Sequence, residues 1–200
     1  KTIISLLNIT LFFCLASFIS CSQKTQKKQE QSHAELTTES YLSKATGEER
    51  DYFVYLPEGY HNDPEKKWPV LLFLHGNGER GNGKDELEFV TVHGPIYEAW
   101  VQKRDLPFII VAPQLPMYGM DSLRDYIKNR KKEDIPQRFN EGVPPRPEEF
   151  ATPQPMKGIA DEEIMPTPPE GPPVGWFMLE DDLLHIVENT LSEYAADPDR

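Results

Sequence analysis

Cysteine is almost absent from this chain of 200 residues, and the two that occur, Cys14 and Cys21, lie near its beginning. Cys14 falls inside an apolar run, and Cys21 directly follows that run. No thiol remains in the rest of the chain, which excludes a disulfide framework or a zinc site with cysteine ligands there. We expect neither a metal nor another cofactor.

Basic residues are also scarce. The chain has 21 lysines and arginines against 33 aspartates and glutamates, which gives a net charge of -12 and an isoelectric point near 4.9. Nucleic-acid phosphates require a basic face, so this balance argues against a nucleic-acid partner.

Long apolar runs are limited to residues 3–19, a stretch that is short for a membrane span and follows a basic start. The sequence Phe18-Ile19-Ser20-Cys21 at its end resembles a bacterial lipobox, in which a cysteine is lipidated and becomes the new N-terminus. Residues 1–20 are therefore predicted to be a lipoprotein-type signal peptide. Cys21 would then anchor an exported chain to a bacterial membrane, in the periplasm or at the cell surface. A single N-terminal transmembrane anchor is the alternative.

Residues 21–40 are polar and show no regular apolar spacing. Such a composition predicts a disordered tether. The folded domain is expected over residues 41–200, and the lack of an initiator methionine leads us to expect at least one residue before Lys1.

The most informative stretch is an apolar strand over residues 69–74 that ends in a glycine-rich loop, His75-Gly-Asn-Gly-Glu-Arg-Gly-Asn-Gly83. A run without polar partners predicts a strand buried on both faces. A loop at the end of such a strand is where α/β folds commonly place ligand chemistry.

Three chemistries fit this loop in part. Residues 76–81 match the G-x-G-x-x-G pattern of dinucleotide sites, but no carboxylate ends the next strand, Phe108-Ile-Ile-Val111. Residues 78–85 approach a phosphate-binding G-x-x-x-x-G-K-[ST] pattern, with Asp85 in place of the hydroxyl that holds magnesium. The third interpretation uses His75-Gly76 as a turn whose backbone N–H groups face a developing oxyanion.

Three blocks of the sequence carry a family resemblance: Tyr52-Phe-Val-Tyr-Leu-Pro-Glu-Gly-Tyr60, Trp68 to Gly81, and Phe108-Ile-Ile-Val-Ala-Pro-Gln114. Together they resemble the α/β-hydrolase superfamily, of the secreted esterase and predicted peptidase type. The resemblance covers about residues 45–116 and 176–200. It implies an oxyanion hole formed by Asn77 and Gly78, in a loop shaped by His75, Gly76 and Gly81.

The expected fold class is α/β. The sequence predicts the first half of an α/β-hydrolase sheet, an N-terminal hairpin followed by parallel strands with crossover helices. The predicted elements are strands at 41–45, 51–56, 69–74 and 108–111, and helices at 85–93, 95–103 and 179–194.

Proline is concentrated late in the chain: twelve of the nineteen fall between Pro116 and Pro173. We interpret about residues 117–174 as a proline-rich insertion, because the family pattern continues at Trp176. A long irregular segment of this kind is either a functional cover, here a lid over the active site, or a loose surface insert.

The chain lacks the G-x-S-x-G sequence that presents the nucleophile in this superfamily. The resemblance implies that the catalytic serine, aspartate and histidine lie beyond Arg200. The chain is then an N-terminal fragment, truncated before the nucleophile elbow, with no catalytic residue of its own and no activity. The expected full-length protein is a serine hydrolase of carboxylic esters, with acyl or feruloyl esters of polysaccharides as candidate substrates. A peptidase of the same fold and a non-catalytic, lipid-anchored surface-binding protein are the alternatives.

Overall fold

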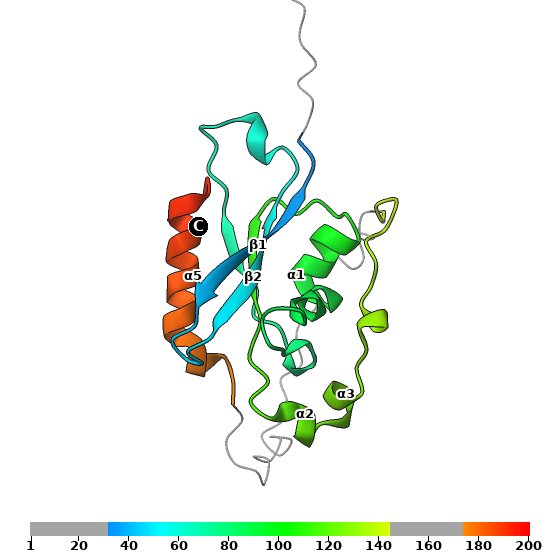
Figure 1. Ribbon diagram of the computed structural model, residues 1–200. Helices are drawn as coiled ribbons and strands as arrows, with labels where there is room; N and C mark the ends of the chain where they lie inside the picture. The colour runs from blue at the N-terminus through cyan, green and yellow to red at the C-terminus, as the bar shows by residue number, and fades with distance from the viewer. Residues whose placement is uncertain (1–31, 145–173) are drawn as a thin grey trace, which may run out of the picture. The chain divides into compact units, whose positions relative to one another are not determined.

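A computed structural model describes residues 32–144 and 174–200. These residues form a mixed α/β domain around a four-stranded sheet with the strand order β1-β2-β4-β3 (Figure 1). The strands are β1 (Glu35–Leu42), β2 (Glu49–Leu56), β3 (Val70–Leu72) and β4 (Ile109–Pro113). The predicted α/β class is confirmed.

One long helix and several short ones accompany the sheet. The α-helices are α1 (Gly94–Ile96), α2 (Met120–Leu123), α3 (Asp125–Lys128) and α5 (Glu180–Glu193). The other helices are the 3-10 helices η1 (Tyr60–Asn62), η2 (Asn77–Glu79), η3 (Leu87–Val92), η5 (Lys132–Asp134) and η7 (Trp176–Leu179), and the π-helix η4 (Tyr97–Val101). Among the described residues, none of these helices has the length and apolar character needed to cross a membrane.

The first two strands form the predicted antiparallel hairpin, but β1 begins at Glu35. The tether predicted over residues 21–40 is therefore wrong for residues 35–40. Their side chains are half-buried or exposed and need little apolar character. Strand β1 is instead held by backbone pairing along the whole of β2, from Glu35 opposite Leu56 to Leu42 opposite Glu49. The predicted signal peptide and Cys21 lie outside the described residues.

Strands β3 and β4 run parallel, as predicted for a strand-helix-strand unit, whereas β2 pairs with β4 in the antiparallel sense. All five residues of β4 are buried, and this strand forms the centre of the sheet. The strand predicted over residues 69–74 is shorter and less buried than expected. Strand β3 spans only Val70–Leu72, and these residues are half-buried because β3 has a strand neighbour on one side only.

Side chains that alternate along β2 and β4 supply two apolar cores, one on each face of the sheet. Val54 and Val111 face one core, which Ile186 of α5 completes. Tyr55 and Ile110 face the other, which is covered by Ile96 of α1 and its neighbours. Figure 1 accordingly shows α5 and α1 on opposite sides of the strands. The period-2 alternation of the strands explains how both faces are filled.

Helix α5 confirms the helix predicted over residues 179–194, and a buried carboxylate anchors its first turn. Asp182 accepts the Ser43 hydroxyl at 2.5 Å and the Lys44 backbone N–H at 2.7 Å, both from the turn between β1 and β2. Its neighbour Asp181 is exposed and lies 3.8 Å from the Lys44 ammonium group.

The chain between the glycine loop and β4 is less regular than predicted. Instead of an α-helix over residues 85–93, the chain forms η3, and Gly94 follows with φ +74°. A Cβ at Gly94 would come within 2.4 Å of the Phe73 ring, so only glycine fits this crossing. The second predicted helix, 95–103, is built from α1 and η4.

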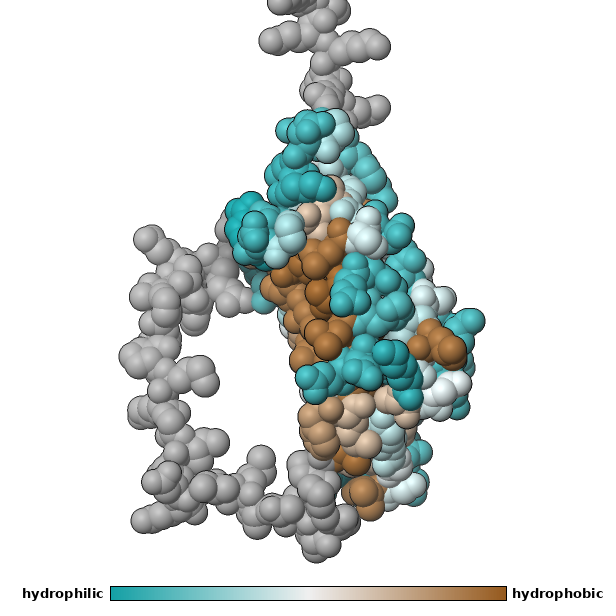
Figure 2. Space-filling view, turned by 90° about the vertical axis from the view of Figure 1, so that its left-hand side faces the viewer, coloured by the Kyte–Doolittle hydropathy of each residue, from teal (hydrophilic) through white to brown (hydrophobic). Residues whose placement is uncertain are grey.

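The segment after α5 lies against the outer edge of β3. Trp68 and Ala196 form a parallel bridge, and the Val70 N–H donates to the Arg200 carbonyl at 3.0 Å. Figure 2, viewed from the side of α5, shows apolar surface bordered by hydrophilic residues. Exposed apolar side chains occur at the end of β3 in Leu74 and along α5 in Leu184 and Leu191.

Candidate functional site

The glycine loop and the residues that follow β4 lie at the same edge of the sheet. Because β3 and β4 are parallel, their carboxyl ends meet there. The Gly81 N–H donates to the Leu115 carbonyl at 3.0 Å, which joins the two stretches directly. The sequence-predicted residues His75, Gly76, Asn77, Gly78 and Gly81 are all brought to this edge.

His75 is the buried link between the two strand ends. Its Nε2 accepts the Leu115 backbone N–H at 2.9 Å, so Nδ1 carries the proton and donates to the Gly76 carbonyl at 2.6 Å. The indole N–H of Trp176 donates to the His75 carbonyl at 3.0 Å, and the two rings meet edge to face. Both ring nitrogens of His75 are thus engaged in holding the backbone.

Burial lowers the pKa of His75 to about 4. The hydrogen bond to Gly76 and the carboxylate of Glu79, 4.0 Å away, oppose this shift but do not overcome the loss of solvation. The ring is therefore neutral at pH 7, and its role is to shape the loop.

Gln114 fixes the far half of the loop. Its amide oxygen accepts the Gly83 N–H at 2.8 Å, and its amide nitrogen donates to the carbonyls of Glu79 and Glu86. A Cβ at Gly81 would lie within 2.7 Å of three atoms of this side chain. Glycine at position 81 is what allows the loop to pack on Gln114.

Arg50 supports the same half of the loop from β2. This buried side chain donates to the carbonyls of Gly81 and Gln114, each at 2.9 Å. Gly83 passes directly over its guanidinium group with φ +68°, a backbone conformation that favours glycine.

The near half of the loop forms the short 3-10 turn η2, with Gly76 extended before it. Asn77 is exposed and Gly78 is half-buried. Across residues 32–144 and 174–200, the backbone N–H groups of Asn77 and Gly78 have no acceptor. The Asn77 side chain points back into the loop, where its oxygen accepts Arg80 Nε at 2.8 Å. The two amides are thus free to bind a group from outside the loop.

Glu79 follows these amides and is buried. Its carboxylate accepts Nδ1 of His93 at 2.5 Å, while the rest of the His93 ring is exposed. The helix predicted over residues 85–93 places His93 at a helix end and does not indicate this contact, because the two residues are fourteen positions apart.

Two arginines connect the loop to the segment after β4. Arg80 donates to the carbonyls of Pro116 and Val174, which lie at the two ends of the predicted insertion. Arg130, from inside that insertion, donates to the carbonyls of Gly78 and Arg80. Neither contact has a signal in the sequence, because both depend on how distant segments meet.

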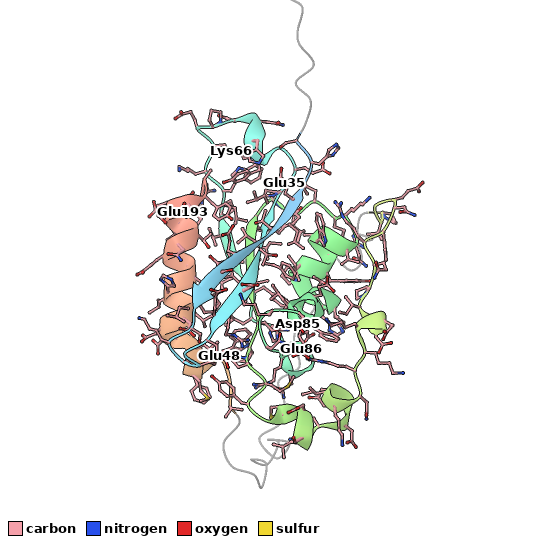
Figure 3. The ribbon with its side chains drawn as sticks, viewed as in Figure 1. Glu35, Glu48, Lys66, Asp85, Glu86 and Glu193 are labelled. Carbon is pink, nitrogen blue, oxygen red and sulfur yellow. The ribbon has the colours of Figure 1, made fainter. Side chains whose placement is uncertain are left out.

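The described part of the insertion, residues 117–144, packs onto the domain. Helices α2 and α3 and the residue after η5 bury Met120, Ile127 and Ile135. A cavity of about 750 Å³ lies between this segment, the glycine loop and the β1–β2 turn. Its lining includes Glu48 from the β1–β2 turn and Glu86 from the residues after the glycine loop, both labelled in Figure 3. Residues 117–144 are therefore not a loose surface insert.

The phosphate-binding alternatives do not fit this geometry. The loop does not open into a helix but closes in the three-residue turn η2. The buried carboxylate of Glu79 would face any polyphosphate cradled there. No group of three or more potential metal ligands occurs among the described residues.

Comparison with known proteins gives partial structural matches to esterases. No family model and no curated protein sequence matches the chain. A structure described as "Crystal Structure of a Thermostable Esterase" matches with 20% identity and a TM-score of 0.37, over 81% of this chain and 32% of that chain. A ferulic acid esterase matches with 30% identity and a TM-score of 0.27, over 40% of this chain and 31% of that chain.

The chain spans about a third of the length of each of the two esterases. A serine, histidine and acid arranged for catalysis are not evident among the described residues.

Proposed function

We propose that this chain is the N-terminal part of an exported serine hydrolase that cleaves carboxylic esters. The observation that carries the proposal is the pair of unbonded amides at Asn77 and Gly78, held at the carboxyl end of a parallel strand pair. Around them, the side chains of His75, Gln114 and Arg50 donate to other backbone carbonyls of the loop, those of Gly76, Glu79 and Gly81.

Ester hydrolysis through an acyl-enzyme passes through a tetrahedral intermediate with a negatively charged oxygen. Preorganised backbone N–H groups stabilise that oxygen without having to reorient during the reaction. One such donor is worth roughly 2.7–4 kcal/mol of transition-state stabilisation. In our proposal the backbone N–H of Asn77 is this donor, and the backbone N–H of Gly78 lies next to it.

The nucleophile, its base and the acid are proposed to lie after Arg200, so that the chain alone is inactive. The direction of the last described residues supports this arrangement, because the bridge from Ala196 to Trp68 is parallel. Residues that continued this direction would run beside β3 and arrive at the edge where the amides of Asn77 and Gly78 lie. A strand there would also cover the half-buried outer side of β3.

The candidate substrates are acyl or feruloyl esters of polysaccharides. We also propose that Cys21 carries a lipid that holds the protein at a bacterial membrane, which follows from the Phe18-Ile19-Ser20-Cys21 sequence. Both proposals rest on the sequence resemblance.

The test begins with the codons that follow Arg200. We expect a short apolar strand and then G-x-S-x-G, and we expect the complete protein to be labelled by a fluorophosphonate and to release p-nitrophenol from p-nitrophenyl acetate with a burst. The matched control is the same protein with the elbow serine changed to alanine, which should give neither signal. A complete protein with no labelled serine would refute the proposed function, and an elbow without serine would favour a binding protein.

A further inference from the structure

The side chain of Arg130 connects the segment after β4 to the glycine loop through hydrogen bonds. It is 11% exposed, its Nη1 donates to the Gly78 carbonyl at 2.9 Å and to the Arg80 carbonyl, and its Nη2 lies 2.7 Å from the Glu86 carboxylate. The guanidinium carbon lies 4.0 Å from the centre of the Phe89 ring. Both terminal nitrogens of the guanidinium group are thus hydrogen-bonded, and the group also stacks on an aromatic ring.

The loop depends on these hydrogen bonds because Gly78 makes no side-chain packing contacts. It carries no side chain, and nothing lies within 4 Å of the position that a Cβ would occupy. The Gly78 carbonyl shares its peptide plane with the Glu79 N–H, so a hydrogen bond to this carbonyl holds the peptide unit that directly follows the Gly78 N–H and limits rotation within Gly78. Because one rigid, planar cation holds the carbonyls of Gly78 and Arg80, it fixes the end of the turn that follows the two amides and so restricts how the turn can move.

We infer that Arg130 is a positioning residue for the oxyanion-binding amides of Asn77 and Gly78. This inference rests on the proposed function and deepens it: part of the catalytic geometry comes from the segment after β4. Arg130 does not touch the substrate in this arrangement. It acts through the Gly78 carbonyl, which anchors the turn directly after the two amides, and its positive charge next to the turn adds to the electrostatic stabilisation of an oxyanion.

Lysine cannot take this place fully. Its ammonium group can reach one or two of the three acceptors, but it offers no planar face for Phe89 and no paired donors in a fixed geometry. Arg130→Lys should therefore fall between the wild type and Arg130→Met.

The experiment uses the complete protein and compares the wild type with Arg130→Met, Arg130→Lys and the control Arg138→Met. Arg138 is a matched control, because it also lies on an aromatic ring, 3.7 Å from the centre of Trp100, and donates to a backbone carbonyl, but it is not bonded to the glycine loop. For each protein, kcat and KM for p-nitrophenyl acetate, the inhibition constant of phenylboronic acid and the thermal midpoint are measured. The boronate is the key probe, because its serine adduct places a tetrahedral oxygen at the oxyanion amides.

For Arg130→Met we expect kcat to fall about 10- to 100-fold, with KM within about twofold of the wild type. The inhibition constant of phenylboronic acid should rise by the same factor. A loss of thermal stability with unchanged kcat and unchanged boronate affinity would overturn the inference and leave Arg130 a purely structural residue. An unreactive wild type refutes the proposed function, whereas a reactive wild type matched by Arg130→Met refutes this inference alone.

Discussion

The ring of His75 accepts the backbone N–H of Leu115 at 2.9 Å and so joins the end of β3 to the end of β4. Only a neutral imidazole can accept this hydrogen bond. Burial lowers the pKa of His75 from 6.5 to about 4. Between these two pH values the ring is protonated more readily in the unfolded chain than in the folded one, which lowers the free energy of unfolding. Stability from the neutral ring is complete above about pH 6.5 and is lost as the pH falls toward 4.

We therefore predict that acid destabilises the wild type more than His75→Gln. The pKa difference corresponds to roughly 2–3 kcal/mol lost between pH 7 and pH 4.5, and the glutamine variant lacks this contribution. Urea unfolding at the two pH values measures it. His185→Gln is the control, since that ring is exposed on α5 and should leave the wild-type pH dependence intact. Equal acid sensitivity of wild type and His75→Gln would contradict the assigned burial effect.

Gly81→Ala should destabilise the domain by about 1–3 kcal/mol, because its Cβ would overlap a Gln114 side chain that three hydrogen bonds hold in place. Gly78→Ala is the comparison for stability, since the space around that Cβ position is open. Thermal or urea unfolding of the two variants decides the matter. If both cost the same, the packing of Gly81 on Gln114 is not what limits the position.

Asn77→Pro should lower kcat for ester hydrolysis by the complete protein about 10²- to 10³-fold, because it deletes the backbone N–H proposed to bind the oxyanion. Proline is compatible with the first position of a helical turn, and the preceding Gly76 is already extended, with φ -82° and ψ -169°. Kinetics with p-nitrophenyl acetate provide the measurement.

The companion variant Asn77→Ala retains the N–H and loses only the side-chain bond to Arg80. Its kcat should stay within about tenfold of the wild type. If the alanine variant is as poor as the proline variant, the side chain matters rather than the amide.

Asp182→Ala should cost about 2–3 kcal/mol of unfolding free energy, since it leaves the Ser43 hydroxyl and the Lys44 N–H without their buried acceptor. The neighbouring Asp181→Ala removes only an exposed pair with Lys44 at 3.8 Å and should change stability by less than about 0.5 kcal/mol. Chemical denaturation of both variants gives the difference. Similar values for the two would mean that Asp182 does not anchor α5.

The sequence predicted those parts of the fold that carry a local pattern. The apolar runs of β3 and β4, the alternation in β2 and the helical spacing in α5 are visible without a structure. They yield the parallel strand pair, the hairpin and the last helix. Residues 35–40 of β1 have no such pattern, because they are held in the strand by backbone pairing with β2 and not by apolar side chains of their own. From their sequence alone, these residues are therefore predicted to belong to the tether.

The glycine loop illustrates the same limit within the candidate site. Its glycines and its position after a strand are local facts, and they led to Asn77 and Gly78. The side chains that hold the loop come from far along the chain: Arg130 is 52 residues from Gly78, and Gln114 is 31 residues from Gly83. Such contacts are decided by tertiary packing, which a single sequence does not display.

The guanidinium of Arg80 binds the carbonyls of both Pro116 and Val174, so two positions far apart in the sequence meet at one side chain. A change in the number of residues between these two positions would therefore leave the register of the preceding strands unchanged, because the two positions stay held by Arg80.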